Sequence, residues 1–142
     1  METTEKIKAT PSAKRIPRQR KTSVVAVVRK LILVDATDKS LGRLAVEVSI
    51  LLRGKNKADF VHYKDVGDTV VVKNIDKMKF TGNKLENKNY FHYTGYLGNL
   101  KKKTLKEFLI KRGPKEVLRV AIMGMLPKNK LRAKQIKRLR FE

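Results

Sequence analysis

The sequence predicts a single α/β domain, and three observations lead to this fold class. Two short apolar runs, 31–34 and 69–72, have the composition of strands buried inside a sheet. A segment with apolar residues at helical spacing lies between them, so strand, helix and strand alternate along the chain. A hydrophobic content of 41% over 142 residues is enough to form one core. We expect the domain to span residues 24–142, after a basic extended arm at 1–23.

The first strand and helix have recognisable boundaries. Residues 31–34 predict a buried strand, and 35–39 predict a turn. Ser40 suits the N-cap of a helix that begins at Leu41, and Gly54 occupies the position of a C-terminal capping glycine. One face of this helix is apolar and should pack on the sheet, through Leu41, Leu44, Ala45, Val48 and Leu52.

The middle of the chain predicts a second buried strand and then less regular structure. Residues 69–72 follow a Gly67-Asp68 turn and should be buried on both faces of a sheet. Residues 74–77 predict a turn, and 78–80 predict another short strand. The aromatic and glycine-rich segment 90–98 predicts an irregular loop.

The last third predicts two helices and a basic tail. Thr104 and Glu107 have the spacing of a capping box, which opens a helix through about Lys111. Gly113-Pro114 breaks this helix, and a second helix follows at 115–125 with an apolar stripe. That stripe contains Val117, Leu118, Ala121, Ile122 and Met125, and Pro127 ends the helix. The basic segment after it should be anchored by Leu131, Ile136 and Leu139.

The charge of the chain indicates a polyanionic partner. The formal net charge is +22, and residues 101–142 alone hold a net charge of +12. Self-repulsion of this size is tolerated against phosphate more easily than in a free monomer. The longest apolar run, 24–28, is far too short to span a membrane, and the arm lacks the bulky apolar residues of a membrane-surface helix. The charge therefore favours a nucleic acid over a membrane surface.

Basic residues and two tyrosines are the candidate RNA-binding residues. The tyrosines belong to an aromatic cluster that either stacks on bases or packs internally, with packing favoured for Phe91. The lysine run 101–103 precedes a helix N-terminus, where cations oppose the helix dipole unless phosphate lies nearby. The full set is Lys14, Arg15, Arg18, Arg20, Lys21, Arg43, Arg53, Lys55, Lys57, Lys84, Tyr93, Tyr96, Lys101, Lys102, Lys103, Lys128, Lys130, Arg132, Lys134, Lys137, Arg138 and Arg140.

Catalytic and metal-binding chemistry find little support in the sequence. There is no cysteine, which fits a reducing compartment, and the two histidines, His62 and His92, lie in different predicted loops. The acidic residues show no paired-carboxylate spacing. We expect no catalytic residues, no metal site and no cofactor. Besides a structural RNA-binding protein, a free regulator that binds DNA or mRNA remains as the alternative.

Seven short motifs carry a resemblance to a known family. They occur in order between about Leu31 and Phe141, as Val34-Asp35-Ala36-Thr37, Leu41-Gly42-Arg43-Leu44-Ala45, Leu52-Arg53-Gly54-Lys55, Asp65-Val66-Gly67-Asp68, Thr81-Gly82-Asn83-Lys84, Tyr93-Thr94-Gly95-Tyr96 and Gly124-Met125-Leu126-Pro127-Lys128-Asn129-Lys130-Leu131. In this order and spacing, the chain resembles the bacterial-type L13 family of large-subunit ribosomal proteins.

The resemblance implies more than the residues alone predict. It implies a compact three-layer α/β/α fold with a small, mainly parallel sheet and helices on both sides. It implies binding to large-subunit ribosomal RNA, a part in subunit assembly, and neighbouring large-subunit proteins as partners, without enzymatic activity, membrane or small-molecule substrate. The ribosome would be that of the cytoplasm or that of an organelle matrix, a choice the resemblance leaves open.

Overall fold

The structure is a computed structural model that describes residues 29–142. The predicted arm at 1–23 lies outside the described residues, and so do its candidate RNA contacts and the first residues of the predicted domain, 24–28. Five candidate contacts fall in this part of the chain: Lys14, Arg15, Arg18, Arg20 and Lys21.

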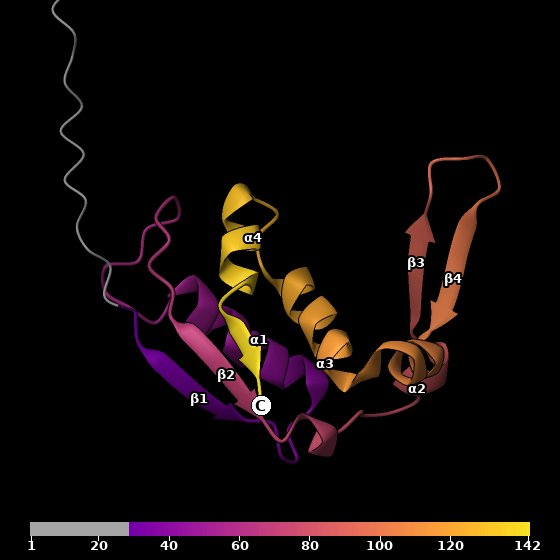
Figure 1. Ribbon diagram of the computed structural model, residues 1–142, viewed down its shortest axis with the longest axis horizontal. Helices are drawn as coiled ribbons and strands as arrows, with labels where there is room; N and C mark the ends of the chain where they lie inside the picture. Colours follow the sequence, from indigo (N-terminus) through magenta and orange to yellow (C-terminus); the bar gives the residue numbers. More distant parts are fainter. Residues whose placement is uncertain (1–28) are drawn as a thin grey trace, which may run out of the picture.

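A small parallel sheet forms the base of the fold (Figure 1). Its strands are β1 (Leu31–Asp35), β2 (Thr69–Lys73) and β5 (Leu139–Phe141), in the order β1-β2-β5. The register places Ile32 beside Val70 and Val70 beside Leu139, so one apolar row crosses all three strands. The α/β class and the parallel sheet are confirmed. The strand at the C-terminal end was not predicted, because its three residues are too few to show a period.

Helix α1 (Leu41–Arg53) forms as its sequence predicts. All five residues of the predicted stripe are buried, and Gly54 takes the left-handed conformation at φ 76°. Its amide donates to the carbonyl oxygens of Ile50 and Leu51, which closes the helix end. Ser40 occupies the N-cap position, but its side chain makes no capping hydrogen bond.

Among residues 29–142, the helices cover one face of the sheet, and the expected second helical layer is absent. The connection from β1 to β2 and the connection from β2 to β5 cross the sheet in the same direction. Because such parallel connections are right-handed, both place their helices on the same face of the sheet. Val34, Val70 and Val72 point to that side and are buried. On the opposite face, Leu31 and Leu33 are 60% and 57% exposed, so β1 is buried on one side only.

Helix α3 (Leu105–Met125) crosses the whole domain with a kink in its middle. Thr104 and Glu107 form the predicted capping box, and Gly113 has a non-helical conformation at φ 77°, ψ 169° that breaks the helix before Pro114. The second half packs on α1 through Val117, Leu118 and Ile122. Met125 was predicted to lie on this stripe, but it is 42% exposed because the stripe turns away from the core there.

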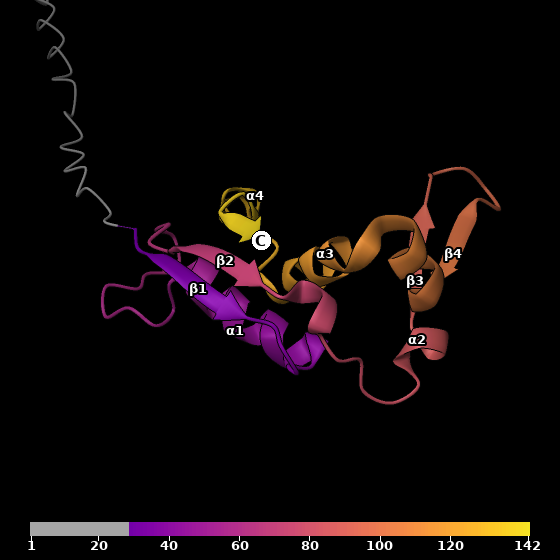
Figure 2. The ribbon, with the colours of Figure 1, turned by 60° about the horizontal axis from the view of Figure 1, so that its bottom comes forward.

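Residues 89–104 form a β-hairpin, and the prediction of an irregular loop for 90–98 is wrong for its first part. β3 (Asn89–Tyr93) pairs antiparallel with β4 (Leu100–Thr104), and only the tip between them is irregular. The hairpin stands away from the parallel sheet, at the far end of α3 (Figures 1 and 2). The glycines that indicated a loop, Gly95 and Gly98, have positive φ at this tip.

Three short elements complete the chain. They are the 3-10 turn η1 (Ile75–Lys77), α2 (Lys84–Asn87) and α4 (Lys130–Ile136). The predicted strand at 78–80 does not form; Lys79 makes only an isolated bridge with Ser40. No helix in the described part of the chain is long and apolar enough to cross a membrane.

Candidate nucleic-acid interface

The structure places most of the described candidate residues in three surface clusters, two as internal cations, and Arg140 apart on β5. The first cluster lies along α1, the second is the β3–β4 hairpin, and the third is the segment around α4. The α4 segment and the hairpin extend to the same side of the molecule, on either side of α3 (Figure 1). The two internal cations are Lys57 and Arg138, which we call, together with Asp65 and Asp68, the anchor cluster.

Arg138 does not face solvent, contrary to its prediction as an RNA-binding residue. Its Nη1 and Nη2 donate to the two carboxylate oxygens of Asp65 at 2.6 and 2.7 Å. Nη2 also donates to the Leu52 carbonyl at 2.9 Å, and Nε donates to the Asp68 carbonyl at 3.3 Å. The side chain is 12% exposed. Because its donors are directed inward, Arg138 joins the end of α1 to β5 and is not available to phosphate.

Lys57 is half-buried, and its ammonium group is likewise directed toward the protein. Its Nζ donates to Asp68 Oδ1 at 2.6 Å and to the Val66 carbonyl at 2.9 Å. Burial raises the pKa of Asp68, but hydrogen bonds from Lys57 Nζ and the Lys30 amide, with the charges of both lysines, lower that pKa below its ordinary value. Asp68 is therefore a buried carboxylate, and Lys57 is its counter-ion and not a free phosphate ligand.

Gly67 allows the backbone to approach closely at the centre of the anchor cluster. A Cβ atom at this position would lie 1.8 Å from the Leu52 carbonyl oxygen and 2.9 Å from Arg138 Nη2. The sequence predicts a turn and a family motif at 65–68, but not the role of these residues as an anchor. The motif itself was the available signal, since two aspartates flank a glycine directly before a buried strand.

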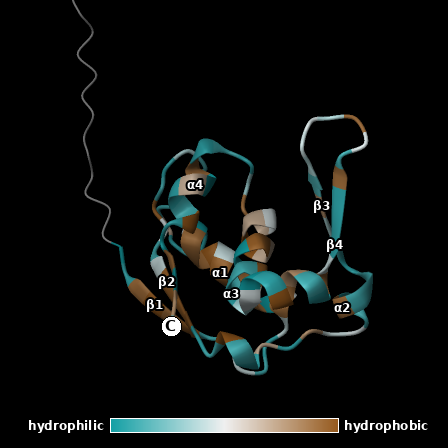
Figure 3. Cartoon of the chain, turned by 45° about the vertical axis from the view of Figure 1, so that its right-hand side comes forward, coloured by the Kyte–Doolittle hydropathy of each residue, from teal (hydrophilic) through white to brown (hydrophobic). Residues whose placement is uncertain are grey.

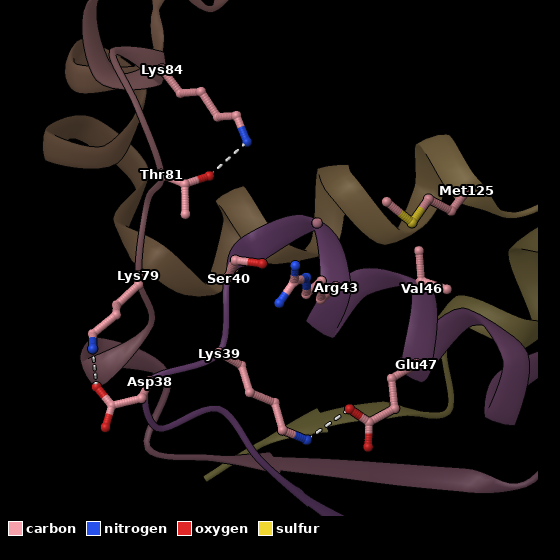
Figure 4. Close-up of a pocket in the computed structure, with 11 residues that line it drawn as sticks. Asp38, Lys39, Ser40, Arg43, Val46, Glu47, Lys79, Thr81, Lys84 and Met125 are labelled. Atoms are coloured by element: carbon pink, nitrogen blue, oxygen red, sulfur yellow. Dashed lines mark hydrogen bonds and ion pairs between the residues drawn. The ribbon is translucent and has the colours of Figure 1, made fainter.

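A groove opens at the N-terminal end of α1 and contains two of the predicted cations (Figure 4). Its volume is about 860 Å³, and Arg43 and Lys84 line it together with Lys39 and Lys79. Lys39 pairs with Glu47, and Lys79 pairs with Asp38, each at 2.7 Å. Lys84 Nζ donates to the Thr81 hydroxyl at 3.0 Å, and Arg43 has no such partner among the described residues. We call this cavity the α1 groove.

At the other end of α1, Arg53 and Lys55 line a second depression with Val46 and Ile50. The Arg53 guanidinium lies 5.1 Å from the centre of the Phe60 ring, and its Nη2 is 2.9 Å from His62 Nδ1. Lys55 is exposed. Both candidates are therefore accessible, although Arg53 is already oriented by neighbouring rings.

The hairpin displays its aromatic and basic residues on two faces. Phe91 pairs with Lys102 and Tyr93 with Leu100, and all four side chains are exposed on the outer face. Tyr90 turns inward and stacks on Phe108 at 4.8 Å. The interpretation that Phe91 packs internally is wrong, because Phe91 is 63% exposed. Tyr96 is 72% exposed at the tip.

The lysines at 101–103 belong to strand β4, which leads directly into α3 through its N-cap residue Thr104, as the sequence predicts. Lys101 and Lys102 are exposed, and Lys103 is half-buried beside Tyr90. Figure 3 shows β4 as hydrophilic over most of its length. These lysines therefore place exposed positive charge just before the N-terminus of α3, where cations oppose the helix dipole unless an anion lies nearby.

The segment around α4 carries the densest positive charge. Lys128, Lys130, Lys134 and Lys137 are exposed, and Arg132 is half-buried. Asn129 caps α4 by accepting a hydrogen bond from the Arg132 amide at 3.1 Å. The predicted anchors Leu131, Ile136 and Leu139 are half-buried or buried. Arg140 lies apart from this cluster, on the open face of β5.

Metal-ligand geometry is absent from residues 29–142. No group of three or more His, Cys, Asp and Glu side chains comes together there in a way that could hold an ion.

Comparison with known proteins identifies close relatives. Residues 29–141 match the family model described as Ribosomal protein L13. The chain is 51% identical over 115 residues to "Large ribosomal subunit protein uL13" of Rubrobacter xylanophilus, covering 81% of this chain and 80% of the relative. It is 49% identical over 114 residues to the protein of that name from Clostridioides difficile, covering 80% and 79%. The corresponding protein of Buchnera aphidicola is 44% identical over 117 residues, covering 82% of each chain.

Proposed function

The chain belongs to the ribosomal protein L13 family, and from this premise we propose that it is a structural constituent of the large ribosomal subunit that binds large-subunit ribosomal RNA. The observation that carries the proposal is the family match over nearly all of the described chain, 29–141. Proteins of this family have a structural role and no enzymatic activity. The net charge of +22 gives a physical reason for binding to RNA phosphates.

The arrangement of the basic residues supports a broad contact with RNA. Three exposed clusters lie on the α1 groove, the hairpin and the α4 segment, and the last two extend to the same side (Figure 1). Double-stranded RNA is recognised chiefly through its shape and its phosphates. Several basic clusters at different places on one folded domain are suited to this kind of recognition. We therefore propose that shape dominates recognition and that unpaired bases meet the aromatic residues.

Among residues 29–142, the proposed RNA contacts are the candidate residues whose side chains are not held inside the protein by other groups. Lys57 and Arg138 are omitted because they belong to the anchor cluster, and the arm residues are retained because of the charge of that segment. The proposed set is Lys14, Arg15, Arg18, Arg20, Lys21, Arg43, Arg53, Lys55, Lys84, Tyr93, Tyr96, Lys101, Lys102, Lys103, Lys128, Lys130, Arg132, Lys134, Lys137 and Arg140. Neighbouring large-subunit proteins are the proposed protein partners.

Sedimentation of a tagged copy tests this function. Cell extract from the source organism is fractionated on a sucrose gradient at two salt concentrations, and the tagged protein is located by immunoblot. We expect it in the large-subunit fractions, retained after a high-salt wash. A tagged protein that stays at the top of the gradient while large subunits sediment normally would contradict the proposal and favour a free regulator.

A further inference from the structure

The α1 groove continues into a second cavity of a different character. This second cavity has a volume of about 390 Å³ and shares Gly42, Lys79, Thr81, Lys84 and Met125 with the groove. Its remaining lining is mostly apolar, with Leu41, Phe80, Tyr90, Val120 and Ala121. We call it the apolar half. Pockets that hold small molecules have volumes of roughly 300–1,000 Å³, so this space matches one small ring system.

Two helical glycines leave this space open. Gly42 lies in the first turn of α1, and Gly124 lies in the last turn of α3. A Cβ atom built on either residue would meet no atom within 4 Å. Because neither position carries a side chain, the space between Gly42 and Gly124 is left unfilled.

The charge around the opening selects an anion. Arg43, Lys84 and Lys88 line the two halves, and Lys88 Nζ lies 5.5 Å from the centre of the Tyr90 ring. Within residues 29–142, the only acidic residues that line either half are Asp38 and Glu47, and both already pair with lysines. An incoming anion would thus meet at least two cations without a competing carboxylate.

From this juxtaposition we propose that the α1 groove and its apolar half together bind one unstacked nucleotide of RNA. The phosphate lies against Arg43 and Lys84, and the base enters the apolar half between Phe80 and Met125. The inference rests on the proposed function, because it takes the occupant from ribosomal RNA. Proteins recognise RNA sequence mainly at unpaired bases, which can be turned out of a stack into such a site.

A titration of the full-length protein with three small probes tests the site. Adenosine 5′-monophosphate, ribose 5-phosphate and inorganic phosphate are added separately, and backbone amides are followed by NMR. We expect all three to shift the amides of Gly42 and Arg43. Only the nucleotide should also shift Gly124, and it should bind about tenfold more tightly than ribose 5-phosphate, within the range for stacking of one base.

Two variants separate the two halves of the site. Gly124→Leu places a side chain in the apolar half, and it should bring nucleotide affinity down to that of ribose 5-phosphate while phosphate binding persists. Arg43→Ala should weaken all three probes. Lys106→Ala is the matched control, since Lys106 is an exposed cation on α3 that does not line either cavity, and it should change nothing.

The outcomes distinguish this inference from the proposed function. If the wild-type protein sediments with large subunits but does not prefer the nucleotide to ribose 5-phosphate, the site is wrong and the function stands. A Gly124→Leu variant with unchanged nucleotide affinity would also overturn the site. In purified subunits, a photocrosslinking amino acid at position 124 should attach to RNA, and attachment to another protein would overturn the choice of occupant.

Discussion

Two clusters near the ends of α1, the anchor cluster and the α1 groove, use positive charge in opposite ways. At the C-terminal end, the anchor cluster holds Arg138 and Lys57 against two carboxylates with low exposure, 14% for Asp65 and 1% for Asp68. At the N-terminal end, the carboxylates of Asp38 and Glu47 are 71% and 46% exposed, and Arg43 has no partner among the described residues. The difference teaches that burial of the carboxylate decides whether a cation serves folding or binding.

The energies of the two arrangements differ accordingly. An exposed ion pair contributes about 0–1 kcal/mol, because water and salt screen it. Removal of one partner from a buried pair costs roughly 3–5 kcal/mol, since the other charge is left buried without compensation. Cations of the anchor cluster should therefore affect stability, and cations of the α1 groove should affect affinity for RNA.

The largest expected effect is the loss of the anchor. Arg138→Met keeps much of the side-chain volume but leaves the Leu52 carbonyl without its donor and Asp65 with Arg29, at 3.6 Å, as its remaining cation, so we expect a loss of about 3 kcal/mol in the free energy of unfolding. Urea denaturation of the purified protein measures it. Arg140→Met, two residues away on the open face of β5, is the control and should unfold like the wild type. Equal stability of the two variants would refute the division between the anchor cluster and the α1 groove.

Residues on and just after α1 provide a second comparison. Leu44 is fully buried, and Leu44→Ala should lower the free energy of unfolding by about 2–5 kcal/mol. Arg43→Ala and Lys55→Ala alter exposed residues and should leave the unfolding midpoint unchanged while weakening binding to an rRNA fragment. Thermal unfolding and fragment affinity are measured on each variant. The division fails if Leu44→Ala keeps its stability, or if both cation variants bind RNA as the wild type does.

The sequence predicts the fold where a regular period or cap is present. The stripe of α1, its capping Gly54 and the box at Thr104 and Glu107 are local patterns, and the structure contains all of them. The hairpin was missed because its tip glycines outweighed the alternation of Tyr90 and His92 with Phe91 and Tyr93. The number of helical layers depends on the path of each crossover over the sheet, which no local pattern encodes.

The sequence predicts which types of residue form the candidate site, but not which cations are exposed and which are held by buried carboxylates. Exposed lysines around α4 follow from the charge count of the C-terminal third. The role of Arg138 does not, because its partner Asp65 lies 73 positions away and the two meet only after β5 joins the sheet. The continuity of the α1 groove with its apolar half was equally out of reach, since its lining comes from residues 38–47, α3 and residues 79–90.

The α4 segment gives a prediction about binding alone. Replacing Lys128, Lys130, Lys134 and Lys137 with alanine removes four exposed cations. If all four meet phosphate, the plot of log affinity against log salt for an rRNA fragment should flatten by roughly three units. Circular dichroism should show an unchanged fold. A slope equal to that of the wild type would exclude these residues from the interface.

The smallest expected effect concerns a carboxylate held by hydrogen bonds without a buried cation. Asp35 accepts hydrogen bonds from the Thr37 amide at 3.0 Å, the Thr37 hydroxyl at 2.7 Å and the Asn74 amide group at 3.1 Å. These bonds, first those from Thr37 and then that from Asn74, lower the pKa of Asp35 from 3.8 to about 2.

Because the folded-state pKa of Asp35 is lowered, its contribution to stability is present above the unfolded-state value and is lost as the pH falls toward the folded-state value. The window is therefore about pH 4 to pH 2, from the pKa values of 3.8 and about 2. Asp35→Asn should melt slightly below the wild type at neutral pH, and the difference should shrink through this window. Asp59→Asn, at an exposed aspartate that makes no ion pair or side-chain hydrogen bond within residues 29–142, is the control. A difference in melting temperature that stays constant from pH 7 to pH 2 would show that the charge of Asp35 does not contribute to stability. In that case, only the charges paired with buried carboxylates would stabilise the fold of this protein.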